Sequence, residues 1–305
     1  MENKAPSKDK VKKHERRKLN KKERATIILC TVFAVLLLIT VWIVKDNRTL
    51  TVSSFSIKSA RLPKAFDGYR IAHVSDLHNT TLGENNETLI SRLRELSPDI
   101  IAMTGDIIDS YNPCVEISLA FVAEAVKIAP CYYVPGNHES RLPDEYEQFK
   151  SGLTKLGVTI LENETVTLNK NGDSFDILGI VDPRFYRETL SKNENHVMEH
   201  LLDKHITGDS EFTLLLSHRP ELFEIYSAYP IDLVLSGHAH GGQFRLPLIG
   251  GLFAPNQGAF PKYDAGLFEK NGTSMIVSRG LGNSSFPFRI NNRPELVVIE
   301  LDSVD

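Results

Sequence analysis

The 305-residue sequence predicts a mixed α/β fold: two stacked mixed β-sheets flanked by helices, an αββα sandwich, preceded by one transmembrane helix. Short apolar runs of strand length, rich in β-branched or aromatic residues, alternate with helical stretches in the first half of the chain. After Gly157 this alternation gives way to consecutive strands and then to a mixture of both. A long uncharged apolar run near the N-terminus adds the membrane helix.

We expect residues 1–24 to form a basic cytoplasmic tail and residues 25–44 to form a transmembrane signal anchor. The 20 residues from Ala25 to Val44 carry no charge, and a helix of that length crosses a hydrocarbon core of ~30 Å. Eleven Lys and Arg precede this run, and only Lys45 and Arg48 follow it closely. The positive-inside rule therefore predicts a single-pass protein of the cell membrane, with its N-terminus cytoplasmic and its body extracytoplasmic.

Two other interpretations of the apolar run are a cleaved secretory signal and a buried core helix. No small-x-small cleavage site follows the run closely, which favours an uncleaved anchor.

Charge is distributed unevenly along the chain. Residues 1–48 hold 13 Lys and Arg against 5 acidic residues, and the remainder holds 22 against 34. Because the body is this acidic, its overall charge does not attract nucleic acid, and we expect no nucleic-acid partner. The 41% hydrophobic content suffices for the core of one large domain.

The three cysteines lack metal-ligand spacing. Pairing of Cys114 with Cys131 is left open, as is the oligomeric state.

The first part of the body has a βαβ rhythm. Residues 45–68 are predicted to be a linker and a first strand, Leu50–Ile57. Glu87–Leu96 places its leucines and isoleucine on one helical face, and Ser97-Pro98 ends the helix. Further helices are predicted at Val115–Ile128 and at Asp144–Leu156, where Pro143 suits the first turn.

The second part is richer in strands. Gly157–Ile180 is predicted to form two or three strands with a turn at residues 169–173. Helices are predicted at Asn193–His205 and Pro220–Ala228, followed by strands and loops from Gln243 onward and a last strand at Leu296–Leu301.

Five polar clusters come directly after apolar runs that are predicted to be strands. They are SDLH (Ser75–His78), GDIID (Gly105–Asp109), GNHE (Gly136–Glu139), SHRP (Ser217–Pro220) and GHAHGG (Gly237–Gly242). Ligands of open α/β sheets bind beyond the carboxyl ends of the strands, so we expect two acids, one amide and five histidines to converge there. This mixture of side chains suits metal chemistry.

The spacing within the clusters favours two adjacent metal ions. In an extended strand end, residues two apart point the same way, so the pairs Asp76/His78 and His238/His240 can each address one point or two neighbouring ions. Asp106 is the natural carboxylate to bridge them. The glycines placed before ligands, Gly105, Gly136 and Gly237, are expected to permit sharp turns and close backbone approach.

The five clusters resemble, in order, the motifs D-x-H, G-D-x-x-D, G-N-H-[ED], a lone H and G-H-x-H of the calcineurin-like metallophosphoesterase superfamily. The resemblance covers Tyr69–Asp302, and it implies that residues 69–305 are a metallophosphoesterase catalytic domain. Within the superfamily the chain is similar to a membrane-anchored bacterial branch, in the stretches GHAHGGQFRLPLIGG and RGLGNSSFPFRINNRPELVVIEL.

The resemblance implies two divalent metal ions, which could be manganese, iron, zinc or magnesium. It assigns Asp76, His78, Asp106 and His240 to the first ion, and Asp106, Asn137, His218 and His238 to the second. His138 is implied as the catalytic residue near the leaving group.

The reaction implied is hydrolysis of phosphomonoester, phosphodiester or pyrophosphate bonds by a hydroxide that the metals make available, with lipid-linked and cell-wall-linked esters among the candidate substrates. The alternative is a catalytically silent binding protein of the same fold at the cell surface. Loss of ligands would mark that case, and all seven implied ligands are present.

Several neighbouring residues have more ordinary interpretations. We expect Asp109 and Glu139 to orient a ligand or a turn, while Arg141 and Arg219 could meet substrate phosphate or form salt bridges. His73, within a strand, is expected to be a hydrogen-bonded core residue.

Two longer segments also have ordinary interpretations. His196–His200 fits the H-x-x-E-H pattern of some metalloproteases, but its histidines fall on the polar face of an amphipathic helix. Leu246–Phe260 could be a lid, a lipid-contacting loop or a packing loop.

Overall fold

The computed structural model describes residues 20–206, 208–283 and 286–304. The chain divides into two compact units, Met1–Trp42 and Ile43–Asp305. Most of the predicted basic tail, residues 1–19, lies outside the described residues.

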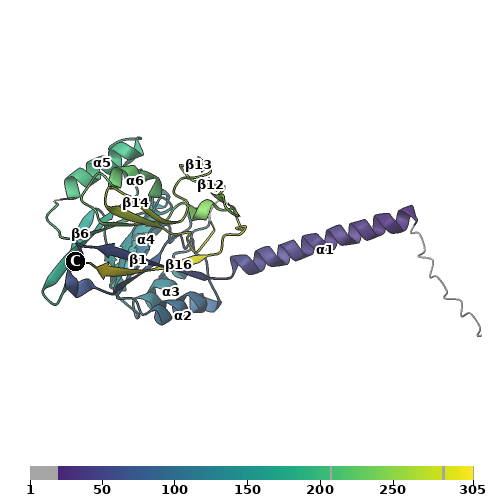
Figure 1. Ribbon diagram of the computed structural model, residues 1–305, viewed down its shortest axis with the longest axis horizontal. Coiled ribbons are helices and arrows are strands. Elements are labelled where there is room, and N and C mark those ends of the chain that lie inside the picture. Colours follow the sequence, from purple (N-terminus) through teal and green to yellow (C-terminus); the bar gives the residue numbers. More distant parts are fainter. Residues whose placement is uncertain (1–19, 207, 284–285, 305) are drawn as a thin grey trace, which may run out of the picture. The chain divides into compact units, whose positions relative to one another are not determined.

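Helix α1 (Lys21–Asn47) contains the whole predicted anchor and extends beyond it at both ends. It is long and apolar enough to cross a membrane (Figure 1). Its start is capped reciprocally: the Asn20 side chain accepts from the N–H of Glu23, and the Glu23 side chain accepts from the N–H of Asn20. The length and apolar composition of α1 agree with the predicted membrane span.

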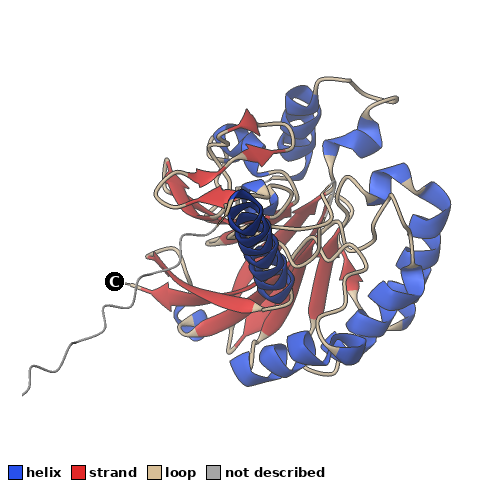
Figure 2. Cartoon of the chain, turned by 90° about the vertical axis from the view of Figure 1, so that its right-hand side faces the viewer, coloured by secondary structure: helices blue, strands red, loops and turns tan. Residues whose placement is uncertain are grey.

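The body contains two six-stranded sheets, visible in Figure 2 as two layers of red strands. The first has the order β1-β16-β2-β3-β4-β5, with β1 (Thr51–Ser59), β2 (Tyr69–Val74), β3 (Ile100–Thr104), β4 (Cys131–Val134), β5 (Thr159–Ile160) and β16 (Glu295–Ser303). The second has the order β14-β15-β9-β8-β7-β6, with β6 (Glu164–Lys170), β7 (Asp173–Ile180), β8 (Thr213–Ser217), β9 (Leu233–Ser236), β14 (Gly266–Lys270) and β15 (Thr273–Val277).

Three hydrophobic clusters show that the layers are those of an αββα sandwich. One fills the space between the sheets, where Ile71 and Ala102 of the first sheet meet Leu214 and Leu235 of the second. The other two lie on the outer faces, under helices α2 to α4 and under α5 and α6 respectively (Figure 1). Central strands that are buried on both faces appear in the sequence as continuous apolar runs, and for this reason they could be predicted. The predicted fold class is confirmed.

The helices agree closely with the sequence prediction, with one correction. They are α2 (Glu87–Leu96), α3 (Val115–Ala125), α4 (Pro143–Lys155), α5 (Glu194–His205) and α6 (Phe223–Tyr226). The helix predicted at Pro220–Ala228 is present but ends earlier, at Tyr226, and its first residues form a 3₁₀ turn, η5 (Pro220–Leu222), before the single turn of α6. Pro230 follows closely and disfavours helical backbone before it, which limits this segment's length.

Short elements complete the body. They are the 3₁₀ turns η1 (Lys64–Phe66), η2 (Glu84–Asn86), η3 (Glu139–Arg141), η4 (Pro183–Tyr186) and η6 (His240–Gly242), and the strands β10 (Arg245–Leu246), β11 (Gly250–Gly251), β12 (Phe253–Ala254) and β13 (Gly258–Ala259). Cys114 and Cys131 are both free, so the pairing left open above does not occur in the structure.

Candidate metal centre

The side chains predicted to bind metal converge from the ends of strands in both sheets. Asp76 Oδ1 lies 3.3 Å from His240 Nε2, 3.9 Å from His78 Nε2 and 4.0 Å from His218 Nε2. Asp106 Oδ2 lies 3.1 Å from His218 Nε2 and 3.8 Å from His78 Nε2. Residues separated by more than 160 positions in the chain are therefore within reach of one pair of ions.

The donor atoms form three groups, two of which match the expected division. Asp76, His78 and His240 form one group, and Asp106, His218 and His238 form another; within each, the donor atoms lie within 4.8 Å of one another. The third group joins His78 to Asp109 and His138. A pocket opens beside both groups. Its lining residues are Asp106, Tyr111, Asn137, His138, Arg141, Arg184, His238, His240 and Pro255.

The backbone at these positions differs from the extended conformation that the sequence suggested. Asp76, His78, Asp106, His238 and His240 all have positive φ, between 47° and 64°. The argument that residues two apart share a direction along an extended strand is therefore wrong, although the side chains do converge. Left-handed backbone costs a non-glycine residue roughly 1–2 kcal/mol. Five such residues in one place indicate a functional site that the surrounding fold holds in this conformation.

The glycines behave as predicted. A Cβ atom on Gly136 would lie 2.3 Å from Asp106 Oδ1, and one on Gly237 would lie 1.9 Å from Ser75 Oγ and 2.2 Å from Asp76 Oδ2. Neither position has room for a side chain. Glycine is therefore required at both for the two carboxylates to reach the centre.

The fit to metal ions rests on buried polar atoms that lack a hydrogen-bond partner among the described residues. They include His218 Nε2, His238 Nε2 and Asn137 Oδ1. Leaving such an atom unsatisfied costs about 1–3 kcal/mol. The other ring nitrogen of His218, Nδ1, lies 2.7 Å from the carbonyl oxygen of Thr104, so it donates there and leaves the lone pair of Nε2 facing Asp106. This is the tautomer that binds a cation.

The electrostatics divide the ligands into two kinds. Burial would raise the pKa of Asp106, but His218 and His138 hold it well below its usual range. Burial lowers the pKa of His240 to about 3 and that of His238 well below its usual value. These residues therefore take the forms that bind divalent cations, ionised acid and neutral imidazole. Burial also opposes protonation of His218 and His78, but Asp106 and Asp109 respectively outweigh it and raise the two pKa values to about 10 and about 9. A metal ion would displace a proton from each of these two rings.

Two acids support the ligands, as expected. The carboxylate of Glu139 accepts four backbone N–H groups, from Asp106, Ile107, Ile108 and Gly136, at 2.8–3.2 Å. It thereby fixes the turn that carries Asp106. Asp109 Oδ1 lies 3.6 Å from His78 Nδ1 and 3.2 Å from His138 Nδ1, on the side of both rings away from the centre.

His138 lines the pocket and points Nε2 toward Asp106 Oδ2, 3.9 Å away. The backbone N–H of Ser110 donates to its Nδ1 at 2.9 Å. In the neutral ring this hydrogen bond favours the proton on Nε2, the nitrogen that faces the centre. The carboxylate of Asp109, 3.2 Å from Nδ1, favours the ring protonated on both nitrogens, which also carries a proton on Nε2. His138 can therefore offer a proton inside the pocket.

Arg219 does not contact the pocket. It is fully buried, and its guanidinium pairs with both oxygens of Asp182 and with Glu221. The salt-bridge interpretation of this residue holds. Arg141 lines the pocket, together with Arg184, which the sequence reasoning missed. Arg184 follows Asp182 and Pro183 at the end of β7, so the rule that found the other clusters could have found it.

A second buried cation, Arg289, was also missed. Its Nη2 lies 3.4 Å from His240 Nδ1, and its guanidinium donates to the carbonyls of Arg279 and Gly282. Asn292 donates to the carbonyl of His240 at 2.7 Å. Both residues lie in the stretch RGLGNSSFPFRINNRPELVVIEL, which carries part of the resemblance, but no motif spacing identifies their contacts with His240.

The other histidines have the ordinary roles expected. His73 is buried, and its Nε2 lies 2.7 Å from the hydroxyl of Thr104. His196 and His200 are exposed on α5, and no potential metal-binding group among the described residues includes them.

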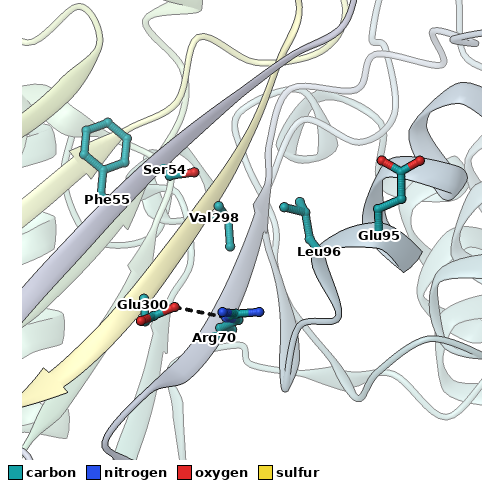
Figure 3. A pocket seen from close by; sticks show the side chains of 7 residues that line it. All are labelled: Ser54, Phe55, Arg70, Glu95, Leu96, Val298 and Glu300. Atoms are coloured by element: carbon teal, nitrogen blue, oxygen red, sulfur yellow. Dashed lines mark hydrogen bonds and ion pairs between the residues drawn. The ribbon is translucent and has the colours of Figure 1, made fainter.

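A separate pocket lies on the first sheet, between β1, β2, β16 and the end of α2 (Figure 3). The pair Arg70–Glu300, 3.0 Å apart, crosses it, and both side chains are nearly half exposed. Ion pairs so exposed contribute little to binding or stability. Since none of its lining residues belongs to the metal-binding groups, this pocket is not the catalytic site.

The fold and the centre define a metal-dependent phosphoric ester hydrolase that takes two divalent metal ions. Residues 69–242 match the family model for the calcineurin-like phosphoesterase domain, and the chain belongs to that family.

Three similar proteins have curated descriptions. An uncharacterized metallophosphoesterase, YkuE, of Bacillus subtilis is 32% identical over 85% of this chain and 88% of its own length. The phosphodiesterase YaeI of Escherichia coli is 28% identical over 68% and 72%, respectively. A transmembrane protein with a metallophosphoesterase domain from Bos taurus is 28% identical over 94% of this chain and 64% of that protein.

Proposed function

We propose that this chain is a phosphodiesterase anchored in the cell membrane by α1, with its catalytic domain outside the cytoplasm. Asp76, His78, Asp106 and His240 hold one metal ion, and Asp106, Asn137, His218 and His238 hold the other. The observation that carries this assignment is the set of buried, unpartnered donor atoms on Asn137, His218 and His238 beside two ionised carboxylates. The similarity to a protein described as a phosphodiesterase supports the diester preference.

Two divalent ions, when bound, offset the carboxylates and supply a positive centre and an activated water for attack on phosphorus. The chain's own residues then bind and orient the ester. Arg141 and Arg184 line the pocket, and Arg guanidinium groups bind phosphoryl oxygens. Because Nε of Arg184 pairs with Glu194 at 3.3 Å, Arg184 would bind phosphate through its terminal nitrogens. His138 holds a proton at Nε2 within the pocket, where it can protonate the leaving oxygen.

An activity measurement tests this proposal against the silent binding protein. The full-length chain, in detergent, is given bis(p-nitrophenyl) phosphate or p-nitrophenyl phosphate, with and without added manganese. We expect turnover that depends on metal, faster with the diester. Absence of metal-dependent turnover of either compound would favour the silent protein. Turnover of the monoester alone would retain the hydrolase and overturn the diester preference.

The proposed topology rests on the basic residues that precede Ala25 and on the similarity to a protein described as transmembrane. Single cysteines introduced near the C-terminus, in a chain whose own three cysteines are replaced by serine, test it in intact cells. A membrane-impermeant maleimide should label a cysteine at Val304 without cell lysis. Labelling that requires lysis would place the catalytic domain in the cytoplasm.

A further inference from the structure

Large apolar side chains gather on two segments that lie beyond the last motif. Of twelve such side chains that are exposed among the described residues after Asn47, seven belong to residues 246–260 and 286–288. These seven, called here the apolar platform, are Leu246, Leu248, Ile249, Phe253, Phe260, Phe286 and Phe288. Scattered exposed apolar residues are ordinary, but a concentration of this kind marks an interaction surface.

The two segments form one unit. The ring of Phe244 lies with its centroid 5.3 Å from that of Phe286 and 5.6 Å from that of Phe288. The side chain of Gln243 donates to the carbonyl of Phe288 at 2.7 Å. The N–H of Arg245 donates to the carbonyl of Ile290 at 3.0 Å. The segments therefore present their apolar side chains from a common base.

That base is tied to the last residues of α1, which belong to the same compact unit as the catalytic domain. The side chain of Asn47 donates to the carbonyl of Arg289 at 2.8 Å and accepts from its N–H at 2.7 Å. Arg293 pairs with Asp46 at 2.5 Å. Val44 ends the uncharged run three residues before Asn47, a rise of about 4.5 Å along a helix. Phe288, next to Arg289, thus lies close to the end of the apolar run.

The same base also adjoins the catalytic centre. The segment 244–260 follows His240 directly through η6, and Pro255 lines the catalytic pocket. On the other segment, Arg289 approaches His240. The platform therefore flanks the pocket on one side and the end of the membrane span on the other.

We propose that the apolar platform inserts into the outer surface of the lipid bilayer beside its own anchor, so that the catalytic pocket receives phosphodiesters of lipid headgroups. This inference rests on the proposed function, from which it takes the anchor and the diester. The cations that adjoin the two segments are already engaged: Arg245 pairs with Asp264, Lys262 with Glu224, and Arg293 with Asp46. Burial of apolar surface therefore drives the insertion, and attraction of these cations to anionic lipid does not.

Quenching by brominated lipid tests the insertion directly. The full-length chain carries one tryptophan, Trp42, which is replaced by phenylalanine. Leu248→Trp and Phe288→Trp are then reconstituted separately into vesicles of phosphatidylcholine with brominated acyl chains. Leu267→Trp is the matched control, because Leu267 and Phe288 are both 39% exposed and Leu267 lies on β14, outside the two segments of the platform. We expect strong quenching at residues 248 and 288, little at residue 267, and no change in 0.5 M salt.

Equal quenching at all three positions would overturn the proposal. So would a blue-shifted, unquenched tryptophan at residue 248, which would show that protein covers the platform. Activity supplies an independent measurement: Leu248→Ser combined with Ile249→Ser should lower turnover of a phosphatidylcholine-type diester in vesicles about tenfold and leave a water-soluble diester unchanged. If no diester is hydrolysed by the unaltered chain, the proposed function fails while the quenching result still decides the insertion.

Discussion

The two halves of the metal centre are built in different ways. The half contributed by the first sheet carries both carboxylates, and an acid braces it: Glu139 accepts the backbone N–H groups of the turn around Asp106. The half contributed by the second sheet carries three histidines, and buried arginines brace it, Arg219 beside His218 and Arg289 beside His240. The difference teaches that a carboxylate, which accepts backbone N–H groups, holds the first half, whereas guanidinium groups, which donate to carboxylates and carbonyls, hold the second.

The two arginines are not equivalent. Burial opposes the charge of Arg219, but Asp182 and Glu221 outweigh it and hold its pKa well above the usual range. Burial lowers the pKa of Arg289 to about 10, because its nearest partners are carbonyl groups and a histidine. We infer that Arg219 is a structural cross-link, while Arg289 positions a ligand.

The largest effect is expected where the two halves meet. Asp106→Asn removes the carboxylate that lies against His218 of one half and His78 of the other. Activity should be lost, and the occupancy of both metals should fall together in elemental analysis. An active variant with two metals bound would show that the halves are independent.

His138 belongs to the first half but faces the pocket. His138→Ala should slow turnover on the order of 10²- to 10⁴-fold, because a positioned proton donor is lost. Metal content should remain that of the unaltered chain. Loss of metal in this variant would mean that His138 is itself a metal ligand of the first half.

Arg219→Met tests the structural cross-link. It leaves Asp182 as a buried carboxylate without its partner, and breaking such a pair costs about 3–5 kcal/mol. The free energy of unfolding of the metal-free chain should fall by that amount, measured by denaturant titration. A double variant, Arg219→Met with Asp182→Leu, should recover much of the loss, and failure to recover would assign the cost to packing.

Arg289→Met should have the opposite profile. It removes the donor that holds the carbonyl of Gly282, whose own N–H donates to the carbonyl of the metal ligand Asp76 at 2.7 Å. Loss of a group that orients a ligand typically weakens metal binding about 10- to 100-fold. Calorimetric titration should show one of the two metals affected, and Arg219→Met is the control of similar size and burial. Unchanged affinity for both metals would remove the distinction between the two arginines.

The sequence predicted the fold and the convergence of the ligands because both follow from local pattern. Central strands buried on two faces appear as apolar runs, and the carboxyl ends of such strands lead to one edge. It did not predict the backbone of the ligands, since positive φ at Asp76 or His238 depends on the turns packed around them. The roles of Arg219 and Arg289 also depend on tertiary contacts. Arg219 contacts Asp182, 37 residues away in the sequence, and Arg289 contacts His240, 49 residues away.

The smallest predicted effect concerns the residue at the end of α1. Asn47→Ala removes two hydrogen bonds to the backbone of Arg289, each contributing about 0.5–1.5 kcal/mol. If Asn47 acts on the centre through Arg289, metal affinity should fall a few-fold, by less than in Arg289→Met. Combined with Arg289→Met it should then add nothing further, because both changes interrupt the same chain of contacts. Additive losses in the double variant would show that Asn47 stabilises the domain without reaching the metal ligand.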